Sequence, residues 1–532
     1  MIQPHQTTCA WLWGGARAAA IGVLLWTVSC SGPVAPPAGQ QQTQVERQPR
    51  LHPALHGVTI PPNICPMTFV VDEPGVWYSL RIESSSGGRY ETAGKDPRMQ
   101  IPLRSWRPLL RGVVGGGELT LLIGVQDAEG TRRGFAPVSL QVSADPVDPY
   151  LAYRRIHPLY NLWFDVGIYQ RELTGWDEEV VIHGKDFSRG CTNCHCFANA
   201  NPATMAVGTR SQEHGSATLV CRNGEVTKLA TKWGYTSWHP SGKAAAYSLN
   251  QVNLFFHEGG NEVRDVCDLD SDLAVYYSGG NRVVTAPGIA APDYLETYPA
   301  WSADGKELYF CRAPITWTDR KRVPPPGYSE LRYSLVKVSF DLESGKFGEP
   351  QVVVSAEETG KSILLPRPSP DGRFVLFCMC DYGCFPIYQP SSDLYLLNLA
   401  TGTHRRLELN SDQSESWHSW SSNSRWFAFS SKRHDGVFTR VYLAHVDAEG
   451  KVGEPFVLPQ ADPAYYDRCL QAFSLPEFAS DRIRVSPRAL AAAVRSGRAL
   501  PVELPPMSMT APKAKPPPAP GTGAEAQPPA PH

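Results

Sequence analysis

The sequence predicts an all-β protein, in which a small β-sandwich-like module precedes an array of repeated strands. Three observations support this fold class. The chain of 532 residues holds 48 prolines and 45 glycines, more than average usage and typical of a turn-rich protein. Short apolar runs alternate with turn signals along most of the chain. One turn pattern also recurs four times in the second half.

Residues 1–30 are predicted to be a signal peptide. Arg17 precedes an apolar run over 18–28 that is too short to cross a bilayer as a helix. The run ends at Ser29-Cys30, which resembles a bacterial lipoprotein signal, and this resemblance implies a lipid on Cys30. The family prefers leucine where this chain has Thr27, so plain cleavage stays open, as does a mis-assigned start codon. We expect export to the periplasm or cell envelope, with a membrane reached only through a lipid anchor.

Two segments of different composition follow the leader. Residues 31–55 are rich in proline and glutamine and predict a flexible tether. Residues 56–146 predict the sandwich-like module, because strand-like runs alternate there with glycine-rich turns. The expected strands lie at 67–71, 76–82, 119–125 and 137–142.

The repeated turn lies within residues 216–480. Each copy leads directly into an apolar strand, and its glycine tolerates the positive φ of a tight turn. The pattern resembles the TolB-type β-propeller repeat, which implies about six blades within 150–475, two of them too degenerate to detect. A repeat-free β-sandwich is the alternative. The copies are Ser237-Trp238-His239-Pro240-Ser241-Gly242-Lys243, Ala300-Trp301-Ser302-Ala303-Asp304-Gly305-Lys306, Arg367-Pro368-Ser369-Pro370-Asp371-Gly372-Arg373 and Ser419-Trp420-Ser421-Ser422-Asn423-Ser424-Arg425.

The end of the chain predicts little regular structure. Ser486-Pro487 is typical of an N-cap and first helical residue, and Gly497 of a stop, so a short helix is expected within 481–502. Residues 503–532 are rich in proline and alanine and predict a disordered tail.

Cys191-Thr192-Asn193-Cys194-His195 is the sharpest chemical signal in the chain. Cys-x-x-Cys-His is the attachment motif of c-type haem: Cys191 and Cys194 would bond the haem vinyl groups, and His195 would be the proximal iron ligand. Its flanks predict an accessible loop within a connecting segment over 147–215. We therefore expect one covalent haem c.

Other readings of the two thiols stay open. They could form a structural disulfide, a redox dithiol, or a zinc site completed by Cys378, Cys380 or Cys384. Without Cys9, Cys30 and the motif pair, nine of the 13 cysteines remain, an odd number that leaves at least one thiol free or paired between chains. Buried strand thiols are the simplest interpretation of the other three named here.

The sixth iron ligand is less clearly marked. Residues 200–205 could begin a helix that presents Met205 ten residues after His195, and methionine is a usual partner of histidine on iron. Met205 could equally be a core residue. The rival ligands are His183, His214 and His239, the last of which also fits as a turn residue of its repeat. An open sixth position is the remaining option.

The order of the motifs over 56–480 resembles a family of exported TolB-like propeller proteins with one c-type haem motif. The resemblance implies haem binding and electron transfer, with an unidentified redox or protein partner docked on the propeller. One alternative is a non-redox propeller scaffold, and another is a haem peroxidase-like enzyme. The formal net charge of -2 argues against nucleic acid as a partner. No hydrolase Gly-x-Ser-x-Gly turn, His-Glu-x-x-His motif or phosphate loop occurs, so a carrier or binding protein is favoured over a hydrolase.

Overall fold

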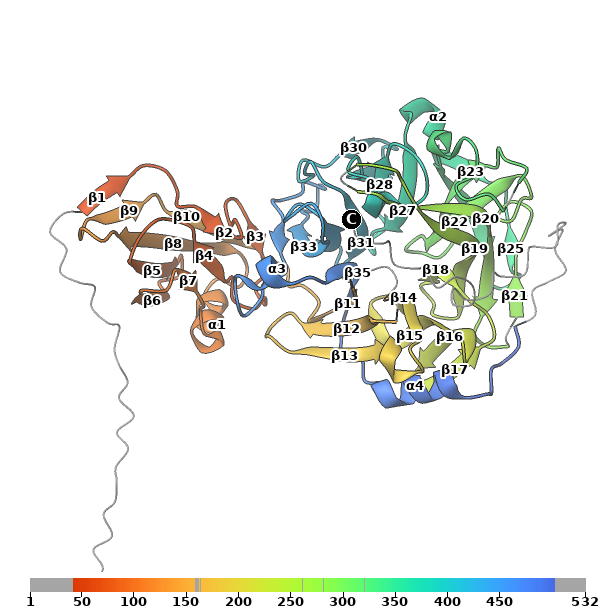
Figure 1. Ribbon diagram of the computed structural model, residues 1–532, viewed down its shortest axis with the longest axis horizontal. Helices are drawn as coiled ribbons and strands as arrows, with labels where there is room; N and C mark the ends of the chain where they lie inside the picture. The colour runs from red at the N-terminus through yellow and green to blue at the C-terminus, as the bar shows by residue number, and fades with distance from the viewer. Residues whose placement is uncertain are drawn as a thin grey trace, which may run out of the picture.

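The computed structural model describes residues 42–502, apart from 158–161, 163, 261, 281 and 320. The predicted signal peptide with Cys30, the first part of the tether and the tail over 503–532 lie outside the described residues. The prediction of an all-β protein with an N-terminal module and a propeller is confirmed: a small β module lies beside a ring of sheets (Figure 1). Within the described residues, no helix is long and apolar enough to span a bilayer.

The N-terminal module packs two sheets and one helix around a shared core. Strand β8 shows why: its residues alternate between buried and half-buried positions, as expected for a sheet with one face on the core. Helix α1, which the sequence did not predict, buries Trp106 and Leu109. The larger sheet holds β1 (Gln42–Val45), β3 (Thr59–Ile60), β5 (Trp77–Ser84), β6 (Arg89–Gly94), β8 (Gly117–Gln126), β9 (Arg132–Phe135) and β10 (Val138–Val142); the smaller holds β2 (Leu51–His52), β4 (Phe69–Val71) and β7 (Arg98–Met99), and α1 spans Leu103–Arg111.

Part of the predicted tether belongs to this module. β1 pairs with β9 and β2 pairs with β4. Leu51 and Leu55 are both buried in the core. Residues 42–55 are therefore structured, because a few apolar side chains between the polar residues are enough to anchor two edge strands.

Six sheets form the ring. The innermost strand of each sheet contacts the innermost strand of the next, and β35 contacts β14 to close the circle. The sheets, in ring order, are β11 (Tyr150–Ile156), β12 (Val166–Glu172), β13 (Glu178–His183) with β35 (Ala472–Ala479); β14 (Cys191–Ala198), β15 (Asn201–Ser211), β16 (Gly215–Arg222), β17 (Glu225–Leu229); β18 (Gly234–Trp238), β19 (Ala244–Phe256), β20 (Arg264–Tyr277), β21 (Arg282–Val284); β22 (Tyr294–Trp301), β23 (Glu307–Pro314), β24 (Ser334–Asp341), β25 (Lys346–Phe347), β26 (Gln351–Val354); β27 (Ser362–Pro368), β28 (Phe374–Cys380), β29 (Asp393–Asn398), β30 (His404–Arg406); and β31 (Glu415–Trp420), β32 (Trp426–Ser431), β33 (Arg440–His445), β34 (Phe456–Val457).

The ring begins near residue 150, within the range expected for the blades, and not at the expected domain boundary of 216. Residues 147–215 were expected to connect the module to a propeller over 216–480, yet they supply β11 to β15 and the start of β16. These first two sheets lack the repeated Trp-Ser turn, so nothing in their sequence marks them as repeats. The first sheet is completed by β35 from the far end of the chain, which pairs with β11.

The predicted repeat turns are confirmed. Each joins the innermost strand of its sheet to the second strand. The four key residues all adopt the left-handed backbone that the pattern predicts, including the one that is not glycine: φ is 67° at Gly242, 73° at Gly305, 70° at Gly372 and 60° at Ser424.

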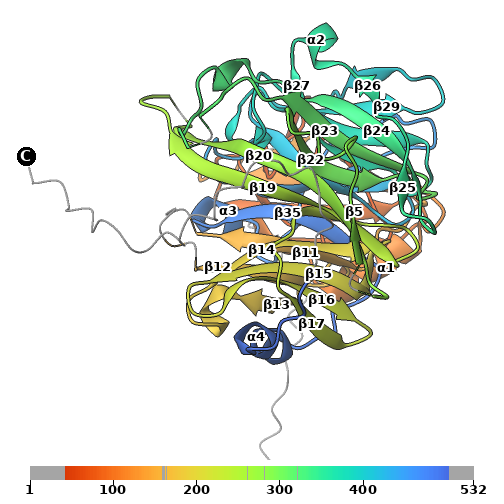
Figure 2. The ribbon, with the colours of Figure 1, turned by 90° about the vertical axis from the view of Figure 1, so that its right-hand side faces the viewer.

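Three short helices lie in or beside the ring. Helices α2 (Ala356–Thr359) and α3 (Tyr465–Arg468) are single turns. Helix α4 (Pro487–Arg495) begins after Ser486, whose side chain accepts a hydrogen bond from the Ala489 amide, and ends two residues before Gly497. It packs against β13 and β17 at the outer edge of the first two sheets (Figure 2).

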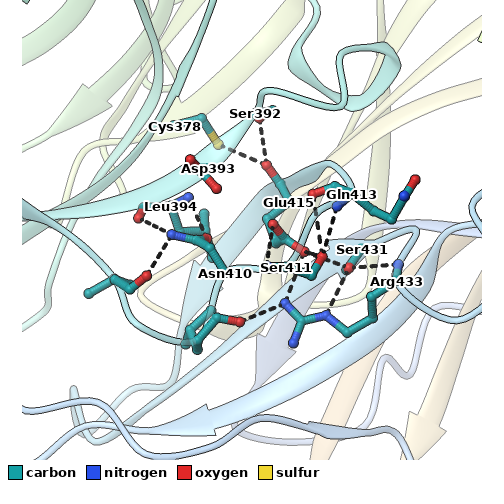
Figure 3. Close-up of polar contacts among 12 residues, drawn as sticks. Cys378, Ser392, Asp393, Leu394, Asn410, Ser411, Gln413, Glu415, Ser431 and Arg433 are labelled. Atoms are coloured by element: carbon teal, nitrogen blue, oxygen red, sulfur yellow. Dashed lines mark hydrogen bonds and ion pairs between the residues drawn. The ribbon is translucent and has the colours of Figure 1, made fainter.

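A buried ion pair of the sixth sheet lies against the fifth sheet (Figure 3). Glu415 on β31 is fully buried, and its Oε1 accepts hydrogen bonds from Ser411, Ser431 and Arg433 at 2.6, 2.9 and 2.9 Å. Its backbone carbonyl accepts the hydroxyl of Ser392 from the fifth sheet at 2.7 Å. The carboxylate thus has a full set of partners, as a buried charge requires.

The N-terminal module is joined to the ring by direct hydrogen bonds. The indole of Trp426 donates to the carbonyl of Asp145 at 2.9 Å, and the Cys65 amide donates to the Leu173 carbonyl at 2.7 Å. Val58 also forms an isolated bridge with Glu454. These contacts hold the module against the sixth and first sheets.

Candidate functional site

The Cys-x-x-Cys-His motif lies on β14, the innermost strand of the second sheet, and not on a loop as predicted. The register shifts by one residue between Thr192 and His195, so Asn193 and Cys194 form a β-bulge. A shift of one residue occurs at the matching place in each of the other five innermost strands. The motif therefore occupies a position that the ring repeats six times.

The two motif thiols are half-buried and lie near Lys232. No disulfide joins any of the described cysteines. Burial and the charge of Arg210 lower the pKa of Lys232 to about 8, while Asp268 and the thiols Cys194 and Cys191 act in the opposite direction. The two thiols therefore form no disulfide, are partly accessible and lie near a cation.

His195 is the most unusual residue of the motif. Its side chain is fully buried. Neither ring nitrogen makes a well-formed hydrogen bond, although the Ala152 carbonyl lies near enough to affect its ionisation. Burial and the charge of Arg154 lower the pKa of His195 to about 3, so the ring is neutral at physiological pH. A buried, neutral and unpartnered imidazole is an available metal ligand.

Glu477 on β35 faces this imidazole. Its Oε2 lies 3.8 Å from Nε2 of His195, and its Oε1 accepts the Phe197 amide at 2.8 Å. Burial raises the pKa of Glu477 to about 8, against the Phe197 hydrogen bond and the charge of Arg367. The carboxyl, whose side chain is 24% exposed, is therefore largely protonated at neutral pH and places little charge beside the neutral imidazole.

This titration predicts how stability depends on pH. The folded state holds a proton on Glu477 that the unfolded chain releases near pH 4.5, so stability falls as the pH rises from about 4.5 to about 8. Glu477→Gln removes this pH-dependent contribution to the free energy of unfolding. We expect the variant to gain stability relative to the wild type between pH 5 and pH 8, measured by urea unfolding of the haem-free protein. An equal difference at both pH values would contradict the raised pKa.

A cavity of about 170 Å³ opens beside His195 in the central channel. It is lined from five of the six innermost strands, and its wall combines aromatic rings with charged groups. Trp238, Trp420, His418, Arg367 and Glu477 are among the lining residues. Ligand pockets usually measure about 300–1,000 Å³, so this cavity alone is too small for a porphyrin.

Met205 is not placed to bind the same iron as His195. It lies on strand β15 rather than in the predicted helix, and its side chain is fully buried in an apolar cluster with Phe197 and Leu219. In the ladder His195 pairs with Val207, and Phe197 pairs with Met205. Met205 therefore flanks His195 on one face of the sheet, whereas two axial ligands approach iron from opposite sides.

The rival histidines have other partners. His239 bonds Ser241 and the Gly305 carbonyl, which confirms its interpretation as a turn residue. His214 bonds Ser188, and His183 accepts the Lys185 amide. His418 lines the same cavity as His195, but its Nε2 is 2.9 Å from the Leu376 carbonyl and its Nδ1 is 3.7 Å from Cys378 Sγ.

Known structures share the propeller architecture at low sequence identity. TolB from Acinetobacter baumannii is 13% identical with a TM-score of 0.40, over 71% of this chain and 86% of that one. An oligogalacturonate lyase from Vibrio parahaemolyticus is 12% identical with a TM-score of 0.31, over 71% and 100%. The β-propeller domain of the Trilobed protease from Pyrococcus furiosus is 10% identical with a TM-score of 0.31, over 65% and 95%. No protein-family model and no curated protein matches the chain.

The motif's donor chemistry fits a c-type haem, but the strand conformation does not bring all donors to one side. Cys191 and Cys194 lie toward Lys232, whereas His195 faces Glu477 of the first sheet. The extra residue of the bulge shifts the alternation, so that Cys191 and Cys194 share one face of the strand and His195 lies on the other. Covalent attachment thus requires the bulge of β14 to turn the thiols and the imidazole toward the same side.

A zinc site at the motif lacks ligands. Within the described part of the chain, no set of three Cys, His or carboxylate ligand atoms within 4.8 Å of one another includes a motif residue. Cys378 and Cys380 lie on β28 and are fully buried, and Cys384 is almost fully buried. Burial raises the pKa of each of these three thiols. They are therefore buried thiols of the fifth sheet, as the simplest interpretation had it.

Sequence reasoning missed the partners of His195. Glu477, Arg367, Ser237 and Ser419 follow the same bulge in their own innermost strands as His195 does in β14. Three of these residues open a repeated turn segment, so the repeat alignment already placed them in one column. The residues at this aligned position lie at the same level of the channel wall once the ring closes.

Proposed function

We propose that this chain is an exported haem protein, in which Cys191 and Cys194 attach one haem c and His195 is an axial ligand, and that it transfers electrons. The observation that carries the proposal is the fully buried imidazole of His195, whose two nitrogens make no well-formed hydrogen bond, in a motif whose two thiols form no disulfide. Leaving such a group without a partner costs free energy unless a ligand compensates it. The leader expected over 1–30 agrees, because c-type haem is attached outside the cytoplasmic membrane.

The chain's own residues divide the work. The two thiols would bind the vinyl groups of the haem. Burial holds the imidazole of His195 neutral and in place. The aromatic rings of Trp238 and Trp420 limit the access of water to the channel. A bound haem would supply one-electron chemistry at its iron. The propeller rim would offer the docking surface for a redox partner.

Covalent haem is the first test. The protein is expressed in a host with a c-haem maturation system and then denatured, and we expect a haem spectrum that stays with the polypeptide. Cys191→Ser with Cys194→Ser should abolish it. Cys196→Ala is the matched control, because Cys196 lies two residues after Cys194 on the same strand, and this variant should keep the covalent haem. A colourless wild-type protein would reject the proposal and favour a non-redox scaffold.

The axial ligands give a second prediction. His195→Ala should keep the covalent haem, because both thiols remain, but shift its visible absorption bands. Met205→Leu should leave the spectrum unchanged, since Met205 lies on the same sheet face as His195. A spectrum that changes with Met205→Leu and not with His195→Ala would reverse this assignment. Turnover of peroxide by the wild type would instead indicate an enzyme.

A further inference from the structure

Three metal-binding side chains meet where the N-terminal module touches the ring. His52 ends β2 of the module, His434 lies between β32 and β33 of the sixth sheet, and Asp467 lies on α3. The segments are far apart in the sequence and no motif links them. They form the one group of three Cys, His or carboxylate ligand atoms within 4.8 Å of one another found among the residues that the structure describes.

The spacing of the ligand atoms is close to that of a bound ion. Oδ1 of Asp467 is 2.8 Å from Nε2 of His52 and 3.2 Å from Nε2 of His434. The two imidazole rings lie 5.3 Å apart, centre to centre. In a tetrahedral zinc site with bonds of about 2.0–2.2 Å, neighbouring ligand atoms are roughly 3.3–3.5 Å apart. Small side-chain movements would therefore complete the site.

The surroundings suit a cation that enters from solvent. The side chains of His52 and Asp467 are each 42% exposed, whereas that of His434 is only 12% exposed and is held beside the Tyr466 ring.

Arg440, a cation near His434, is already engaged. It donates to the backbone carbonyls of Gln471, Tyr466 and Cys469 and forms an ion pair with Asp435 at 3.4 Å. Its positive charge is thus partly neutralised. The carboxylate of Asp467 supplies the negative charge that a divalent ion needs.

We propose that His52, His434 and Asp467 bind one zinc ion, with water as its fourth ligand, and that this ion fastens the N-terminal module to the propeller. Two imidazoles and a carboxylate are ligands that zinc accepts, and such three-ligand sites keep an open position. The site is separate from β14, so it stands whether or not the chain carries haem.

The test is a titration of the purified protein with zinc chloride by calorimetry. Cys191→Ser and Cys194→Ser are introduced first, so that the motif binds neither zinc nor haem. We expect one zinc per chain and a higher midpoint of thermal unfolding with the ion present. His434→Ala and Asp467→Asn should each weaken binding by at least about 100-fold, more than the loss of an outer partner costs. His52→Ala serves as a second ligand variant at an exposed position.

His445→Ala is the matched control. This histidine lies at the same junction, where its Nε2 contacts Asp145 at 3.1 Å and Ser143 at 3.0 Å, but it is not in the cluster. We expect unchanged zinc affinity in this variant. No binding at about 1 mM zinc, or affinity equal to that of the wild type in His434→Ala and His52→Ala, would overturn the proposal. Loss of binding in His445→Ala would overturn it too, because binding would then follow the junction and not these ligands.

Discussion

Arg433→Ala is expected to lower the free energy of unfolding by about 3–5 kcal/mol, because it leaves the carboxylate of Glu415 buried without its cation. Glu415 is fully buried, and Arg433 bonds both its Oε1 and the hydroxyl of Ser431 that shares this oxygen. Burial raises the pKa of Glu415, and the charge of Arg433 is the largest opposing influence. Urea unfolding of the wild type and the variant measures the difference.

Arg406→Ala is the matched control for this loss. Arg406 forms two hydrogen bonds of 2.7 Å with Asp393 on the fifth sheet, yet its side chain is 48% exposed. An exposed pair contributes at most about 1 kcal/mol. Adding Glu415→Gln to Arg433→Ala should recover part of the stability, since a neutral amide needs no cation. If Arg433→Ala cost no more than Arg406→Ala, Arg433 would not stabilise the buried carboxylate of Glu415 as described.

The repeat turns were predictable because their signal is local. A tight turn needs a residue with left-handed backbone conformation at a fixed place, and Gly305 and Gly372 indicate that place in the sequence. Even Ser424 was recognisable, because the residues around it keep the pattern. The all-β class and the propeller followed from these turns and from the strands behind them.

The position of the haem motif was not predictable in this way. The segment from Cys191 to His195 was predicted to lie in a loop, because its flanking residues are typical of loops. The ring makes the segment an innermost strand, since the sheet edge of β15 pairs with it. The same pairing turns the expected helix at Met205 into a strand. Tertiary context decided the conformation of both segments.

The neighbours of His195 depend on contacts between distant parts of the chain. Glu477 reaches it only when β35 returns from the C-terminal side to pair with β11. The group of His52, His434 and Asp467 depends in the same way on docking of the module. Sequence patterns report local periodicity and carry no such distances, so these sites required the structure.

Closure of the ring by β35 leads to the second large expected effect. Phe473→Ala should lower the free energy of unfolding by about 3–5 kcal/mol, the cost of emptying a buried aromatic position. Phe473 is fully buried; its ring centre lies 5.3 Å from that of Tyr153 on β11 and 5.7 Å from that of Tyr466 on α3. Its amide donates to the Thr439 carbonyl at 2.9 Å. The ring of Phe473 thus joins the last strand to β11 and α3, and its amide joins that strand to the segment before β33.

Leu470→Ala is the control that shows whether any change in this segment lowers stability as much as Phe473→Ala does. Leu470 lies three residues before Phe473, but it is 65% exposed, so its truncation should change stability by no more than about 0.5 kcal/mol. Because β35 also carries Glu477, Phe473→Ala should loosen the channel wall beside His195 and speed amide hydrogen exchange in β11 and β14. Exchange that speeds up only within β35 would mean that the ring stays closed without this anchor, and the first sheet would then be held by its backbone ladder alone.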